Sequence, residues 1–244
     1  STNMASGQSR SSIPSTPRPA AEAFCMLALG MALAKRPVLA AGSLLLAMAL
    51  HPLLAMPVCL VAGLIAFPGL QGLRAMALAA LASALVLALA LLNPLGPLQL
   101  MPADWFEVVR YRSPYLFPDL WDGTEWARVA WALSTALTLL RVTGDSNPLG
   151  VLARTAPLVA SIGLLLAYVL GSLFPVQIVV QGQAWRWLWP VTLLALASLP
   201  WLASELWSRG PVARSALLFV VSGLLMYETP GAAVAVLAPA ALWV

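Results

Sequence analysis

The longest polar interval in this chain, residues 93–125, holds five of its nine acidic residues. Three of them, Asp119, Asp122 and Glu125, follow closely on one another and are the candidate catalytic residues. A carboxylate near a membrane surface can act as a general base or position a hydroxyl group. The same carboxylates could bind a divalent cation, although no histidine or cysteine stands near them at metal-ligand spacing.

Two arginines and several aromatic residues belong to the same interval. Arg110 and Arg112 carry planar guanidinium groups suited to bidentate recognition of phosphate. Trp121 offers a ring that can stack on a sugar. Together with the carboxylates, these residues predict a binding site for a phosphate-bearing, sugar-containing lipid. The alternative is an ordinary interfacial loop, because Trp and Tyr concentrate at membrane boundaries.

A second polar segment, residues 174–189, carries Trp185 and Arg186. We expect Arg186 to bind phosphate and Trp185 to stack on the sugar, as a second wall of the same site. The alternative is an amphipathic segment that anchors the chain at the interface. If both polar segments emerge on one side of the membrane, they can meet over one cavity.

His51 is the only histidine in the chain and stands beside Pro52, at the end of an apolar run. One interpretation is a proton-shuttling or ligand-binding role, and the other is a histidine bonded within the fold. A His/Cys metal centre is disfavoured, and no metal ligand is assigned. The chain has no GxxxxGK[ST] or GxGxxG motif, so neither a nucleotide nor another cofactor is expected.

The composition predicts the elements that must position these residues. The chain is 61% hydrophobic and 9% charged, whereas soluble domains average about 45–50% and about 25%. This favours an all-α, polytopic transmembrane helix bundle of about eight or nine segments. We expect residues 1–19 to be irregular and residues 20–244 to form a single transmembrane domain. Nine apolar runs are apparent, at about 20–34, 38–51, 54–70, 75–92, 126–141, 155–173, 190–207, 212–227 and 231–244.

Several of these runs are shorter than the roughly 20 residues that cross a bilayer, so some segments are expected to be paired or re-entrant. The small residues of 77–92 are assigned to helix packing in lipid. Arg18 and Glu22 stand four residues apart and are expected to pair on one helical face.

The distribution of basic residues predicts an orientation. Loops that contain Lys35, Arg74, Arg154 and Arg209 alternate along the chain, and the positive-inside rule places them in the cytoplasm. The N-terminal segment, His51 and both polar segments then face the periplasm of a bacterial inner membrane. The formal charge of +4 is thereby explained by topology, and nucleic acid is not expected as a partner.

The segments TPRPAAEAF (16–24), LLLAMALHPLLAMP (44–57), RSPYLFPDLWDGTEW (112–126) and QAWRWLWP (183–190) resemble parts of bacterial inner-membrane proteins of the GT-C glycosyltransferase type. The resemblance implies a transferase that uses a polyprenyl-phosphate-linked sugar at the periplasmic face during envelope or exopolysaccharide assembly. Membrane lipid and the lipid-linked sugar would be its partners. Such enzymes have a key acidic residue in their first exoplasmic loop, and this chain shows no such loop before its first helix. The resemblance therefore implies a fragment without the main catalytic acid.

Three other functions remain open at this point. An O-antigen polymerase or ligase type is favoured if His51 and Arg112 line one cavity. A flippase or transporter requires a central polar passage. A non-catalytic membrane scaffold would have no convergent polar cavity.

Overall fold

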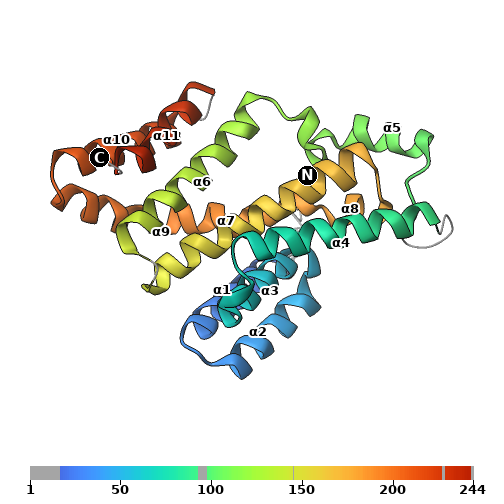
Figure 1. Cartoon of the computed structure of the whole chain (residues 1–244), viewed down its shortest axis with the longest axis horizontal. Coiled ribbons are helices and arrows are strands. Elements are labelled where there is room, and N and C mark those ends of the chain that lie inside the picture. Colours follow the sequence, from blue (N-terminus) through green and yellow to red (C-terminus); the bar gives the residue numbers. More distant parts are fainter. Residues whose placement is uncertain (1–16, 93–97, 145, 227–228, 243–244) are drawn as a thin grey trace, which may run out of the picture.

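The computed structural model describes residues 17–92, 98–144, 146–226 and 229–242, and all of the regular structure in these ranges is helical (Figure 1). The α-helices are α1 (Arg18–Leu33), α2 (Pro37–Leu50), α3 (Pro52–Ala66), α4 (Leu73–Leu92), α5 (Ala103–Arg112), α6 (Gly123–Thr143), α7 (Pro148–Leu166), α8 (Gln177–Gly182), α9 (Trp189–Ser208), α10 (Pro211–Leu225) and α11 (Thr229–Ala241). Short 3-10 turns are η1 (Pro68–Leu70), η2 (Pro114–Leu116), η3 (Pro118–Leu120) and η5 (Ala184–Leu188), and η4 (Ala167–Leu173) is a π-helical continuation of α7. The predicted all-α class is confirmed for these residues.

Prolines set where many of the helices begin. They occupy the first turns of α2, α3, α7, α9 and α10, as Pro37, Pro52, Pro148, Pro190 and Pro211. Proline is favoured there because its fixed φ suits the helix and its missing N–H would have no helical partner. Each of the nine predicted apolar runs corresponds to one α-helix in the described residues, and the runs 54–70 and 155–173 also contain η1 and η4. The segment predicted to be irregular is residues 1–19. Residues 1–16 lie outside the described part of the chain, and α1 begins at Arg18.

Three helical segments are long and apolar enough to cross a membrane: Leu73–Leu92, Pro148–Leu173 and Ala184–Ser208. At 1.5 Å per residue, a helix of about 20 residues spans the roughly 30 Å of bilayer hydrocarbon. Three further apolar helices are shorter, namely α2, α3 and α10, with 14, 15 and 15 residues. The described part of the chain thus has the three candidate spans of a membrane protein.

The largest buried cluster joins α1, α3, α6, α7 and α9. Val58, Trp131, Val159 and Val191 are among its members. Trp131 is 1% exposed, and its indole Nε1 donates a hydrogen bond to the carbonyl oxygen of Val220 in α10 at 2.9 Å. A buried indole N–H without such an acceptor would be costly, so this bond fixes α10 against α6.

Gly163 marks the closest approach between α7 and η5. A Cβ atom built on Gly163 would lie 2.7 Å from the carbonyl oxygen of Ala184 and would overlap Trp187. Real Cβ contacts are not that short, so only glycine lets η5 sit this close to α7. Gly163 therefore positions the segment that carries Trp185 and Arg186.

Helix α4 packs less than its sequence suggests. The small residues of 77–92 were expected to mediate packing, yet α4 buries only Ala75, Ser83 and Ala90. Their spacing of seven to eight residues puts them on one narrow face, and α4 lies along α7 (Figure 1). Most of the rest of its surface is exposed leucine and alanine, as lipid-facing positions can be.

Candidate functional site

The two polar segments lie against each other. Leu100 and Val176 form an isolated antiparallel bridge. The N–H of Met101 donates to the carbonyl oxygen of Pro175 at 2.7 Å, and the N–H of Gln177 donates to that of Gln99 at 3.0 Å. Both segments therefore belong to the same end of the molecule, although residues 93–97 lie outside the described part.

Neither segment is an extended loop. Within 98–125, the short helices start at prolines or directly after them: Pro102 precedes α5, Pro114 begins η2 and Pro118 begins η3. In 174–189, α8 ends at Gly182, and the backbone of the next residue, Gln183, is left-handed with φ of 51°. These turns fold the polar residues into a compact structure.

Arg110 and Asp119 form an ion pair inside the first segment. The guanidinium Nη2 lies 2.7 Å from Asp119 Oδ2, and its carbon is 5.4 Å and 5.3 Å from the ring centres of Phe106 and Phe117. Partial burial by itself raises the pKa of Asp119. The neighbouring Ser172 hydroxyl and the bonded guanidinium of Arg110 favour the charged form and outweigh burial, so the pKa of Asp119 lies below its ordinary value of 3.8. This ion pair joins α5 and η3.

Asp122 and Glu125 form the N-terminal cap of α6. Asp122 Oδ1 accepts hydrogen bonds from the N–H groups of Thr124 and Glu125, at 2.6 and 3.3 Å. Glu125 Oε2 in turn accepts from the N–H of Asp122 at 3.2 Å. This reciprocal capping box has the spacing D-x-x-E ahead of an apolar run, a signal that was present in the sequence.

A cleft of about 740 Å³ opens beside this cap. It is built by the starts of α1 and α6, by η2, by η5 and by the first half of α9. Its lining includes apolar side chains, namely Leu54, Val129, Leu188, Leu193 and Leu196. It also includes aromatic rings and charges: Tyr115, Trp121, Trp185, Trp189, Arg18, Glu22, Glu125, Arg128 and Arg186. The cleft therefore has the two chemical characters of an amphiphile.

Aromatic contacts hold the two segments together at the cleft. Tyr115 and Trp185 meet edge to face, with ring centres 5.8 Å apart. Trp121 contacts Trp126 at 5.3 Å. The indole Nε1 of Trp185 is buried and has no hydrogen-bond partner among the described residues, so it is a donor that a ligand could satisfy.

The charged residues of the cleft are oriented by neighbours. Arg18 Nε lies 2.9 Å from Glu22 Oε1, which confirms the predicted i, i+4 pair. The Nε of Arg186 donates to Gln183 Oε1, and its guanidinium carbon is 4.9 Å from the ring centre of Trp185. Three arginines and two glutamates among the described residues line the cleft, so positive charge is in excess. This balance favours an anionic group.

The predicted site residues separate into two groups. Trp121, Glu125, Trp185 and Arg186 line the cleft. Five others do not: Arg110 and Asp119 pair with each other, Asp122 caps α6, Arg112 is exposed at the end of α5, and His51 lies between α2 and α3. The Nδ1 of His51 is buried and unpartnered among the described residues.

Sequence reasoning did not assign Arg18, Glu22, Arg128 or Tyr115 to the site, although all four line the cleft. Their common signal is position. Arg18 and Glu22 start α1, Arg128 follows the cap of α6, and Tyr115 stands in the short η2 turn. These residues could have been assigned to the site from the sequence because they stand at helix starts predicted to lie on the same side of the membrane.

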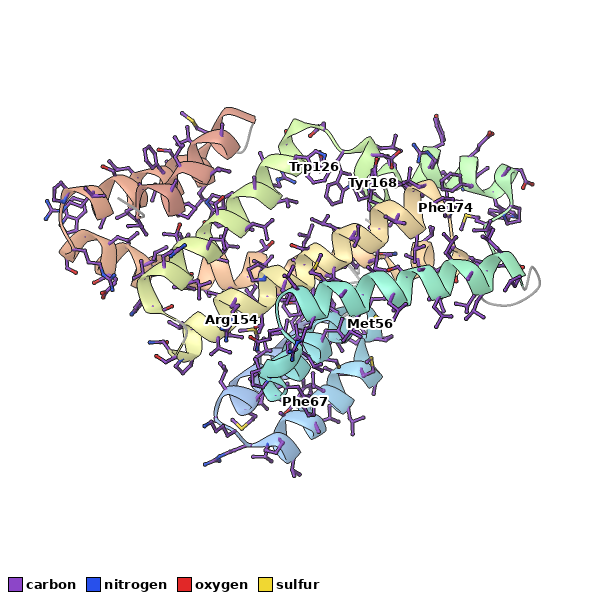
Figure 2. The ribbon with its side chains drawn as sticks, viewed as in Figure 1. Met56, Phe67, Trp126, Arg154, Tyr168 and Phe174 are labelled. Carbon is purple, nitrogen blue, oxygen red and sulfur yellow. The ribbon has the colours of Figure 1, made fainter. Side chains whose placement is uncertain are left out.

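Two of the basic residues predicted for the cytoplasmic side, Lys35 and Arg154, lie away from the cleft. They line a separate cavity of about 950 Å³, and no residue lines both this cavity and the cleft. Arg154 in α7 and Trp126 in α6 occupy opposite ends of that helix pair (Figure 2). The predicted orientation of the loops stays a prediction.

Among the described residues, no three His, Cys, Asp or Glu side chains are grouped as metal ligands. Comparison with protein-family models, with curated proteins and with solved structures finds no match to this chain.

Proposed function

We propose that this protein is a multi-pass protein of the bacterial inner membrane that binds a polyprenyl-phosphate-linked sugar in the cleft and transfers the sugar, in the manner of a GT-C-type glycosyltransferase. The observation that carries the proposal is the lining of the cleft, which combines apolar side chains with aromatic rings and arginines. The phosphate would bind among the arginines, with hydrocarbon against the leucines.

Arg186 is the best-placed phosphate ligand. Its bond to Gln183 and its position over the Trp185 ring hold the guanidinium in the cleft before any ligand arrives. Such preorganisation lowers the entropy lost on binding. Trp121 and Trp185 would stack on the sugar ring, and the unpartnered Nε1 of Trp185 would bond a sugar or phosphate oxygen.

Glu125 is the candidate base, because it alone of the three predicted catalytic acids lines the cleft. In the transfer step an acceptor hydroxyl oxygen bonds to the anomeric carbon as the bond between that carbon and the phosphate oxygen breaks. The hydroxyl proton passes to Glu125, and the leaving phosphate stays paired with Arg186. The capping bond uses Oε2, so the other carboxylate oxygen can take the proton.

The alternatives have less support. The O-antigen polymerase or ligase type would have His51 and Arg112 on one cavity, and neither residue lines the cleft. A transporter would have a continuous polar passage, whereas the cavities at the two ends of α1 share no lining residue in the described part of the chain.

Lipid binding tests the proposal directly. The protein in nanodiscs is titrated with a fluorescent polyprenyl phosphate, and unlabelled polyprenol serves as the neutral competitor. Arg186→Ala is expected to weaken binding about tenfold or more, since a charge-assisted hydrogen bond contributes about 1.5–3 kcal/mol. Arg214→Ala is the matched control, because Arg214 in the first turn of α10 also lies over a tryptophan, at 5.0 Å from the ring centre of Trp207 at the end of α9, and neither residue lines the cleft.

Equal weakening by Arg186→Ala and Arg214→Ala, or equal competition by polyprenol, would refute phosphate recognition. Glu125→Gln separates binding from chemistry, because a glutamine carbonyl can still complete the capping box. This variant is expected to keep polyprenyl-phosphate binding and to lose transfer of radiolabelled sugar from polyprenyl-phosphate hexoses in membranes. Full transfer by Glu125→Gln would exclude Glu125 as the base.

A further inference from the structure

A second cavity adjoins the cleft, between α5 and the α8 segment. Its volume is about 480 Å³, within the roughly 300–1,000 Å³ of small-molecule sites. Figure 1 shows α5 and α8 as neighbours at one end of the molecule. Four glutamines line the cavity together with a tryptophan: Gln99, Gln177, Gln181, Gln183 and Trp105.

The lining differs from that of the cleft in charge. Among the described residues no Asp, Glu, Lys or Arg lines this cavity. Its remaining wall is mainly apolar and includes Val109, Leu116 and Val180. A charged ligand would find no counter-ion here and would lose its hydration, so the cavity suits a neutral ligand.

The glutamine amides are arranged to bond hydroxyl groups. Gln99 Nε2 donates to Gln177 Oε1 at 2.8 Å, which leaves the carbonyl oxygen and second N–H of Gln99 and the NH₂ group of Gln177 available. Gln183 uses its carbonyl oxygen for Arg186 and keeps its NH₂ group as a donor. A hydroxyl group both donates and accepts, so paired amides complement it better than charges do.

Trp105 completes the site. Its side chain is 62% exposed although it stands on α5 beside the glutamines. An exposed indole offers a flat apolar surface on which the carbon face of a sugar ring can stack while the hydroxyl groups reach the amides.

We propose that this cavity binds a neutral, hydroxyl-rich saccharide. The cavity and the cleft are in contact through Gln183, which lines the first and bonds to Arg186 in the second. Tyr115 lines the cleft while the next residue, Leu116, lines the cavity. If the function proposed above holds, the saccharide here is the acceptor, and its hydroxyl group lies near the phosphate-linked donor.

Saturation-transfer difference NMR tests the binding without any lipid substrate. The full chain in nanodiscs is mixed with the methyl α-glycosides of glucose, galactose and mannose, and with glucose 6-phosphate as the charged comparator. At least one methyl glycoside is expected to receive saturation, and Trp105→Ala is expected to weaken its binding about fivefold or more. Trp207→Ala is the matched control, since Trp207 is 60% exposed at the far end of α9, and it is expected to change nothing.

Two further variants guard against a folding artefact. Trp105→Tyr retains a ring and is expected to retain most of the binding, and Gln181→Ala is expected to weaken binding with the tryptophan intact. Gel filtration and circular dichroism establish that each variant is folded. No saturation of any methyl glycoside, equal losses in Trp105→Ala and Trp207→Ala, or stronger saturation of glucose 6-phosphate would overturn the proposal. Because no polyprenyl phosphate is present, this result is independent of the lipid-binding test: glycoside binding with no phosphate recognition would reject only the proposed transferase.

Discussion

Gly163→Ala is expected to destabilise the protein and to disturb the cleft. The added Cβ would lie 2.7 Å from the carbonyl oxygen of Ala184 and would overlap Trp187. The first obstacle is backbone and the second is the root of a large side chain, so neither can swing away. Overpacking of this kind costs about 1–3 kcal/mol.

The unfolding temperature reports this cost. For a chain of this size 1 kcal/mol corresponds to about 2–4 °C, so Gly163→Ala is expected to lower the Tm by about 2–12 °C in scanning fluorimetry of the detergent-solubilised protein. Relief of the clash moves η5 away from α7, and η5 carries Trp185 and Arg186. Weaker polyprenyl-phosphate binding is therefore expected together with the lower Tm.

The same substitution at Gly42 is the matched control. Gly42 lies inside α2 and has no atom within 4 Å of its would-be Cβ. Alanine there removes the entropic cost of a helical glycine, about 0.5–1 kcal/mol, so Gly42→Ala is expected to raise the Tm by about 1–4 °C. A Tm of Gly163→Ala at or above that of the wild type would refute the close approach of α7 and η5.

The Arg110–Asp119 pair and the cap of α6 make further predictions. The pKa of Asp119 is lowered in the folded protein. Its carboxylate therefore contributes its full stabilisation of the fold at pH values above the ordinary carboxyl pKa of 3.8. This contribution is lost as the pH falls through the lower pKa of the folded state. The wild type is thus expected to lose its Tm advantage over Asp119→Asn as acid titrations pass below that range, and a Tm difference independent of pH would contradict the ion pair. Asp122→Ala removes the side chain that accepts from two N–H groups of α6 and is expected to cost about 0.5–2 kcal/mol, measured as a lower Tm. Asp122→Ser restores a capping oxygen and is expected to recover most of the loss; an Asp122→Ala variant as stable as the wild type would show that the cap contributes little.

Much of the fold was predictable because its causes are local. Apolar runs and proline positions determine where helices form and begin, so all nine runs correspond to helices. The Arg18–Glu22 pair follows from helical spacing alone. The capping box of Asp122 and Glu125 was equally local, but those carboxylates were assigned to catalysis because acids in a polar interval of a membrane protein suggest chemistry.

The packing of α4 was not predictable, because it depends on contacts with distant parts of the chain. Small residues permit close approach, yet whether another helix approaches depends on the rest of the bundle. Only the narrow face with Ala75, Ser83 and Ala90 is buried. Arg110 shows the same limit, since the proximity of Phe106, Phe117 and Asp119 makes it part of the fold.

The sequence by itself determined that this is a helical membrane protein with two polar, tryptophan-bearing segments. The abundance of apolar residues and the scarcity of charge favour this class, whatever the arrangement of the helices. Only the tertiary structure decided which polar residues share a cavity. Arg18 and Glu22 line the same cleft as Glu125, Trp185 and Arg186 because α1 packs on α3, α6 packs on α7 and α9, and η5 packs on α3, α7 and α9. Contacts between elements so far apart in the chain depend on the whole set of packed surfaces.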